Sequence, residues 1–120
     1  MASFTKVQLS GSTGGRLIKV AATATTGTTI HATGTSSSTL DEVWLYAVNS
    51  DTTDRKLTIE FGGTTSPDDT IEQTITAESG LILVVPGFVL AGTGSAARTI
   101  TAFCATANVV MIGGYVNRIS

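Results

Sequence analysis

Short runs of alternating apolar residues recur about every ten residues along this chain, and clusters of turn residues separate them. This pattern is typical of strands with one buried face, and no window keeps the period of a capped helix. The runs occupy residues 7–9, 17–22, 28–32, 42–48, 55–61, 70–76, 81–85 with a continuation at 88–90, 98–105 and 109–117. The spacing predicts an all-β protein of eight to ten short strands, and we favour a two-sheet sandwich of jelly-roll type.

Threonine, serine and glycine dominate the composition and favour the same fold. The 120 residues include 22 Thr, 11 Ser and 13 Gly against 2 Pro. Threonine is β-branched and suits strands, whereas glycine and serine suit the turns between strands. A chain of this length fits one domain, and it can bury enough surface to fold without disulfides or metal.

The run at 42–48 gives the strongest strand signal, because it is apolar on both faces after Glu42. Such a run predicts a central strand that is covered on both sides. Trp44 and Tyr46 share one face, and we interpret them as core residues between the sheets; a platform that stacks sugars is the alternative. We expect the run at 55–61 to pair with 42–48 as a hairpin, and 98–105 to pair with 109–117 as another.

Residues 1–16 are predicted to form a flexible N-terminal arm, and residues 17–120 a single β-sandwich domain. The arm holds one short amphipathic run that ends in a Gly/Ser/Thr joint at residues 10–15. A free arm of this kind suits the exposed sheet edge of a neighbouring subunit. Phe4, Val7 and Leu9 are therefore the expected partner-binding residues, with a role in assembly rather than in the stability of the domain.

No residue pattern predicts chemistry, so we predict no catalytic, cofactor-binding or metal-binding residue and no enzyme. The single histidine, His31, has no carboxylate close to it in sequence, and we expect it at the surface or an interface. Cys104 shares a face with apolar residues and is expected to be buried. Four loop carboxylates match no calcium loop and are expected to serve their own turns: Asp51, Asp54, Asp68 and Asp69. The G-x-G-x-x-A string at 92–97 precedes a strand rather than a helix, which argues against a dinucleotide site.

The charge pattern argues against two classes of partner, nucleic acids and membranes. Only 13% of residues are charged, the net charge is −2 and the pI is about 5.1, which argues against a nucleic-acid surface. Residues 79–97 and 99–117 carry no charge, but turn residues interrupt both, so we predict no membrane partner. The start of the sequence lacks the pattern of a signal peptide. Few charges in a chain with 42% hydrophobic residues predict a homo-oligomer, with a trimer favoured.

Four segments resemble small virion structural proteins of tailed bacteriophages. They are LDEVWLYAVN at residues 40–49, LTIEFGG at 57–63, LVVPG at 83–87 and IGGYVNRI at 112–119, and the resemblance covers residues 17–119. It implies a β-sandwich that assembles on the phage particle after synthesis in the cytoplasm of the host bacterium. The role it suggests is head decoration: a cement protein, often a trimer, that binds the major capsid protein on the capsid surface. A tail, baseplate or fibre module, which could recognise a glycan, is the alternative.

Overall fold

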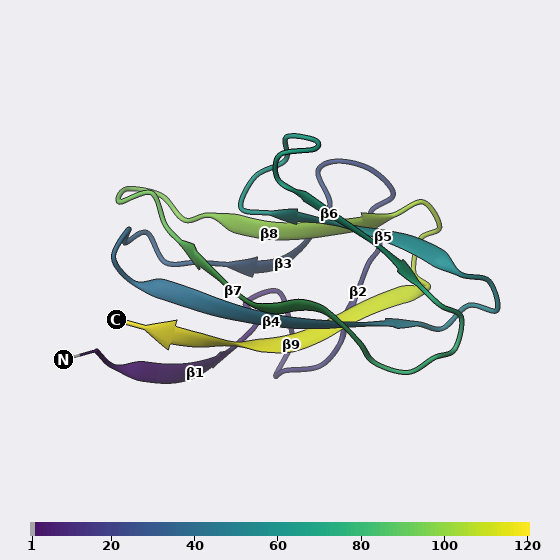
Figure 1. The fold of residues 1–120 in the computed structure, drawn as a ribbon, viewed down its shortest axis with the longest axis horizontal. Helices are drawn as coiled ribbons and strands as arrows, with labels where there is room; N and C mark the ends of the chain where they lie inside the picture. The colour runs from purple at the N-terminus through teal and green to yellow at the C-terminus, as the bar shows by residue number, and fades with distance from the viewer. Residues whose placement is uncertain (1) are drawn as a thin grey trace.

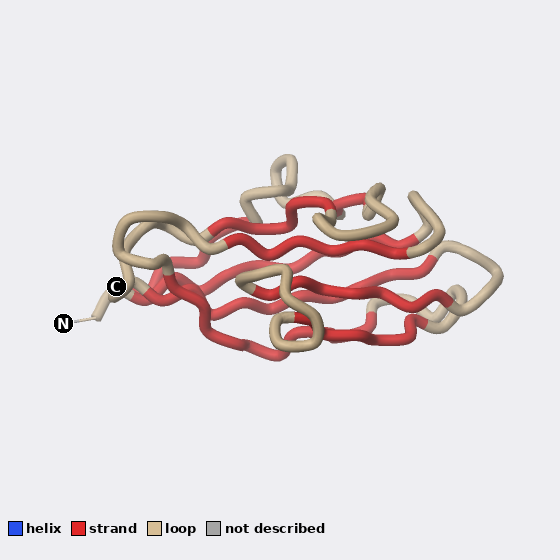
Figure 2. The backbone as a smooth tube through the Cα atoms, turned by 90° about the horizontal axis from the view of Figure 1, so that it is seen from above, coloured by secondary structure: helices blue, strands red, loops and turns tan. Residues whose placement is uncertain are grey.

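The computed structural model describes residues 2–120, in which nine strands form two antiparallel sheets packed face to face (Figures 1 and 2). This confirms the predicted all-β, two-sheet sandwich. Met1, the first residue of the expected arm, lies outside the described residues. Within residues 2–120 no helix is long and apolar enough to cross a membrane. The strands are β1 (Phe4–Gln8), β2 (Ile18–Lys19), β3 (Thr28–Ala32), β4 (Leu40–Asn49), β5 (Arg55–Phe61), β6 (Thr70–Ile75), β7 (Ile82–Ala91), β8 (Thr99–Cys104) and β9 (Val110–Ile119).

The two sheets draw their strands from distant parts of the sequence. Sheet A has the order β1-β9-β4-β7, with β2 also paired to β9, and sheet B has the order β3-β8-β5-β6. The predicted hairpins are therefore wrong, because β4 and β5 lie in different sheets, as do β8 and β9. β4 instead pairs along its whole length with β9 and along most of it with β7. β4 is therefore a central strand, as predicted, but the expected cover on both sides is wrong, because only the face of Val43, Leu45 and Ala47 packs against sheet B.

Strict alternation along the strands builds the core. Val43, Leu45 and Ala47 of β4 have no exposed surface, while the residues between them keep part of theirs. Leu57 and Ile59 of β5 face them from the opposite sheet, while Thr58 and Glu60 between and after them are buried on the outer side of that sheet. Because successive side chains of a strand point to opposite faces, one face of each sheet forms the shared core. The other face of sheet A is left without a covering layer by the described residues.

The N-terminal segment lies within the sandwich, which differs from the expected free arm. β1 pairs with β9 in a continuous register from Phe4 opposite Ile119 to Gln8 opposite Tyr115. Leu9 is 2% exposed and belongs to the core. The backbone N–H of Gly11 donates to the carbonyl of Ile30 on β3. β1 therefore satisfies backbone groups that β9 would otherwise leave unpaired, which is the physical reason for its place.

Candidate interaction face on the outer side of sheet A

The register of sheet A places a largely apolar surface on its outer side, which one polar row crosses. Residues between the buried positions of β4 stand beside the matching residues of β7, β9 and β1. We define the outer face of sheet A by these residues: Leu40, Trp44, Tyr46, Leu83, Val89 and Tyr115. Charged groups are sparse on it, with Lys6 and Glu42 in one row and Lys19 near its end.

Trp44 stands at the centre of this face, so its interpretation as a core residue between the sheets is wrong. Its ring stacks beside that of Tyr115, with centroids 6.4 Å apart and an angle of 15° between the planes. The indole N–H donates to Oε1 of Glu42 at 2.9 Å, and the Asn117 amide donates to the same oxygen at 2.9 Å. These bonds lower the pKa of Glu42. Tyr46 shares the outer side and is half-buried as well.

The absence of a side chain at Gly87 lets the indole of Trp44 pack against β7. Gly87 has a φ of 82°, and a Cβ atom there would lie 2.8 Å from the Trp44 ring. A side chain at this position would displace the ring and would also strain the backbone. The aromatic pair is therefore held flat against sheet A by the choice of residue on β7.

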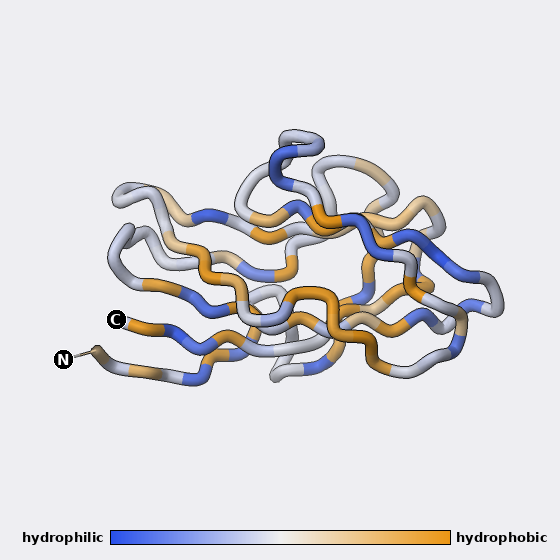
Figure 3. The backbone as a smooth tube through the Cα atoms, viewed as in Figure 1, coloured by the Kyte–Doolittle hydropathy of each residue, from blue (hydrophilic) through white to orange (hydrophobic). Residues whose placement is uncertain are grey.

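Apolar side chains along β7 extend the face to the edge of the sheet. Leu83 is 44% exposed and Val89 is 48% exposed, and Leu81 just before the strand is 62% exposed. Figure 3 shows this front strand coloured as hydrophobic over most of its length. Large exposed apolar patches on a protein surface mark sites of contact. In the sequence, the only sign of this apolar strand was the uncharged run at 79–97, and composition alone could not show which of its side chains face the core and which face outward.

The outer side of sheet B has the opposite character. It carries polar residues, and residues 22–27 lie over part of it, where the N–H of Gly27 donates to Oε1 of Glu60 at 2.8 Å. Burial works to raise the pKa of Glu60, but hydrogen bonds from Thr101, Gly27 and Thr25 outweigh it and hold the pKa below its usual value. Thr58 and Thr101 are buried on the same side. The contrast identifies the outer face of sheet A as the candidate site.

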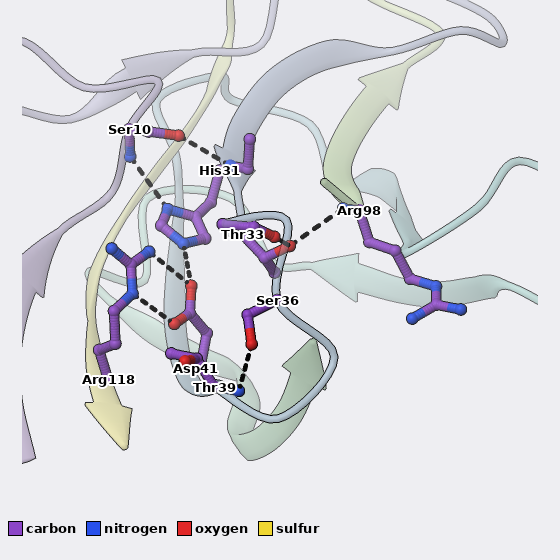
Figure 4. Close-up of polar contacts among 10 residues, drawn as sticks. Ser10, His31, Thr33, Ser36, Thr39, Asp41, Arg98 and Arg118 are labelled. Atoms are coloured by element: carbon purple, nitrogen blue, oxygen red, sulfur yellow. Dashed lines mark hydrogen bonds and ion pairs between the residues drawn. The ribbon is translucent and has the colours of Figure 1, made fainter. Parts of the chain in front are cut away.

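His31 is buried, not at the surface, and the fold brings a carboxylate to it (Figure 4). Its Nδ1 accepts from the backbone N–H of Ser10 at 3.0 Å, so the proton sits on Nε2, which donates to Oδ2 of Asp41 at 2.8 Å. Arg118 donates to both oxygens of Asp41, at 2.7 and 2.9 Å. Both ring nitrogens of His31 are engaged, and the ring is 1% exposed. The cluster therefore serves to join the sheets and offers no free base.

Asp41 is the centre of this cluster. Burial works to raise the pKa of its carboxyl, but the hydrogen bonds and charges of Arg118 and His31 outweigh burial and lower the pKa. Asp41 itself raises the pKa of Arg118. A carboxylate that receives three hydrogen bonds from two charged or polar side chains is stabilised in its ionised form.

The other candidate residues have structural roles. Cys104 is buried, as predicted. Asp51 pairs with Arg55 and Asp69 accepts from the N–H of Thr65, each within its own turn, whereas Asp54 accepts from the N–H of Ala77 in a different turn, which differs from the expected local role. Residues 2–120 contain no group of three or more His, Cys, Asp or Glu placed to hold a metal ion.

The expected partner-binding residues are separated by the structure. Leu9 is in the core and Val7 packs against it, whereas Phe4 is 73% exposed. Sequence reasoning missed Leu83, Val89 and Tyr115, because their shared face depends on strand pairing. No family model matches the chain, and neither a curated protein nor a solved structure matches it significantly.

Proposed function

We propose that this chain is a non-enzymatic structural protein of a bacteriophage virion and acts as a head decoration protein. In this role a homo-oligomer binds the major capsid protein on the outer surface of the shell and stabilises the particle. The proposal combines the resemblance of four sequence segments to phage virion proteins with a surface suited to protein contact.

The apolar outer face of sheet A carries the proposal. Its centre holds Trp44 and Tyr115, and aromatic residues of these types are enriched where protein interfaces hold most of their binding energy. Leu83 and Val89 extend the apolar surface toward the edge. Lys6 and Glu42 supply polar groups to it, and the ammonium of Lys6 lies 4.8 Å from the centre of the Tyr115 ring. Covering this face with a protein surface removes apolar area from water.

Electron microscopy of the virion that carries this protein, combined with a binding assay, tests the proposal. We expect density for the protein on the head lattice, and sedimentation of the purified protein with heads that lack it. Leu83→Glu should weaken head binding at least tenfold, because it buries a charge in the contact. Thr74→Glu, an exposed change on sheet B, is the matched control and should bind as the wild type does. Absence of the protein from the head lattice contradicts the decoration role.

The Trp44–Tyr115 pair favours one second candidate, a tail, baseplate or fibre module that recognises a glycan. Two neighbouring rings beside the Glu42 carboxylate and the Asn117 amide combine stacking surface with hydrogen-bonding groups. In this case density is confined to the tail, and a glycan array gives binding that Trp44→Ala abolishes. Heads that bind the protein while the array stays blank argue against this candidate.

A further inference from the structure

An apolar cavity opens on the side of the sandwich where β6 and β7 run at the edges of their sheets. Its volume is about 210 Å³, and it is lined by Ile71, Val84, Val85, Pro86 and Phe88. Every lining side chain is apolar. Phe88 is 57% exposed at this site, and its ring meets that of Phe61 edge to face at 6.1 Å. A cavity of about 150 Å³ with apolar walls holds a benzene ring, so this one has room for a phenyl side chain.

Phe4 offers an exposed phenyl ring of a size that such a cavity can hold. Its exposed fraction, 73%, exceeds that of the other exposed large hydrophobic residues. β1 and β7 lie at opposite edges of sheet A, with β9 and β4 between them, so the ring of Phe4 cannot reach the cavity of its own chain. The β1 edge of sheet A therefore exposes the phenyl ring of Phe4, and the β7 edge carries the apolar cavity.

The charges at the two edges also favour a contact between Phe4 of one copy and the cavity of another. Residues 1–40 contain three basic residues and no acidic one, and two of the three, Lys6 and Lys19, lie on the strands that form the β1 and β2 edge. The strand beside the cavity, β6, carries Glu72, which pairs with Lys56 of β5 at 3.1 Å, and it follows Asp68 and Asp69, so acidic groups outnumber the basic one at this edge. Opposite charges on the two edges attract a second copy in a head-to-tail orientation and disfavour like edges meeting.

We propose that Phe4 of one copy binds the Ile71–Phe88 cavity of the next copy, so that the protein associates with itself head to tail. Such a contact uses two different surfaces of the chain and generates a ring where the rotation closes. A trimer is one ring that uses every Phe4 and every cavity. The inference deepens the homo-oligomer of the proposed function, but it does not depend on a virion role.

Complementation between two variants tests this contact in solution, without any particle. Phe4→Ser keeps the cavity and loses the ring, whereas Phe88→Lys keeps the ring and places a cation at the mouth of the cavity. By light scattering at about 100 μM we expect an oligomer for the wild type and a monomer for each variant, with self-association weakened at least tenfold. An equimolar mixture should form a heterodimer, since one intact contact remains between the two variants.

Leu83→Ser, which removes an exposed apolar side chain of β7 outside the cavity, is the control and should leave the oligomer intact. Raising the salt concentration should weaken the wild-type oligomer. A monomeric wild type, a Phe4→Ser variant that still assembles, or a mixture that stays monomeric overturns the inference. If Phe88→Lys does not fold, as judged by its thermal unfolding, Phe88→Ser replaces it in the same mixture. Failure of head binding, by contrast, leaves these results unchanged and bears only on the virion role.

Discussion

Nε2 of His31 lies 2.8 Å from Oδ2 of Asp41, and this buried bond links β3 of sheet B to β4 of sheet A. Both side chains are 1% exposed. Arg118 of β9 completes the cluster from the far end of the chain. Two consecutive strands from different sheets and the C-terminal strand are thereby fixed in one relative position.

Removing the carboxylate should be strongly destabilising. Asp41→Ala leaves the guanidinium of Arg118 and the ring N–H of His31 without their partner, and breaking a buried pair in this way costs about 3–5 kcal/mol. Urea unfolding measures the change. Glu72→Ala, which removes an exposed pair with Lys56, is the control and should cost less than about 1 kcal/mol. Equal losses for the two variants would contradict the structural role of Asp41.

The free energy of unfolding should fall in acid. Folding lowers the pKa of both Asp41 and Glu60, so the folded state favours their ionised forms. The resulting stabilisation is fully present above the unfolded pKa values, about 4, and is lost as the pH falls through the lower folded values. Chemical denaturation between pH 7 and pH 2 measures this loss. The stability difference between wild type and Asp41→Asn should shrink across the same range, and a constant difference would argue against this assignment.

Trp44 and Leu45 are neighbours with different burial, and their truncations should differ accordingly. Leu45→Ala removes a side chain with no exposed surface and should cost about 2–5 kcal/mol. Trp44→Ala removes a half-buried ring from the outer face and should cost about 1–2 kcal/mol, because part of its area already faces water. Denaturant titration compares the two. A larger loss for Trp44→Ala would mean that the ring supports the core.

The N-terminal strand should contribute to the stability of the single chain. Deleting residues 2–9 removes the pairing of β1 with β9 and the buried side chain of Leu9, so the melting temperature should fall by about 10 °C or more. Leu9→Ala alone should cost about 2–5 kcal/mol. Phe4→Ser should leave the melting temperature of the monomer nearly unchanged, since its ring is exposed. If the deletion leaves the melting temperature of the monomer unchanged, residues 2–9 act as a separate arm and β1 does not stabilise the domain.

No relative is found from which a function could be transferred, so the proposed function rests on the resemblance of the four sequence segments and on the surface of this chain. The decisive surface feature is the difference between the two outer faces. Sheet A presents Trp44, Tyr115 and Leu83 to the outside, whereas sheet B places polar threonines there and partly covers them with residues 22–27.

The amino-acid sequence by itself determined most of the strands, and the inner face of those that alternate apolar with polar residues. Period-two alternation is a local property, so Leu57 and Ile59 could be assigned to an interior without knowledge of the partners of their strand. The burial of Cys104 followed from the same reasoning. Tertiary structure decided which strands are neighbours: β4 pairs with β7 and β9 rather than with β5, because pairing between distant segments depends on how whole faces are covered.

The same limit applies to the site and the polar cluster. Nothing local distinguishes the two apolar faces of β4, so whether Trp44 faces the core or the outside was decided only when sheet B covered the side of Val43 and Leu45. Asp41 and Arg118 are 77 residues apart, and no short-range pattern joins them. Strand alternation is encoded between adjacent residues, whereas the outer face and the buried cluster arise from contacts that exist only after both sheets have assembled.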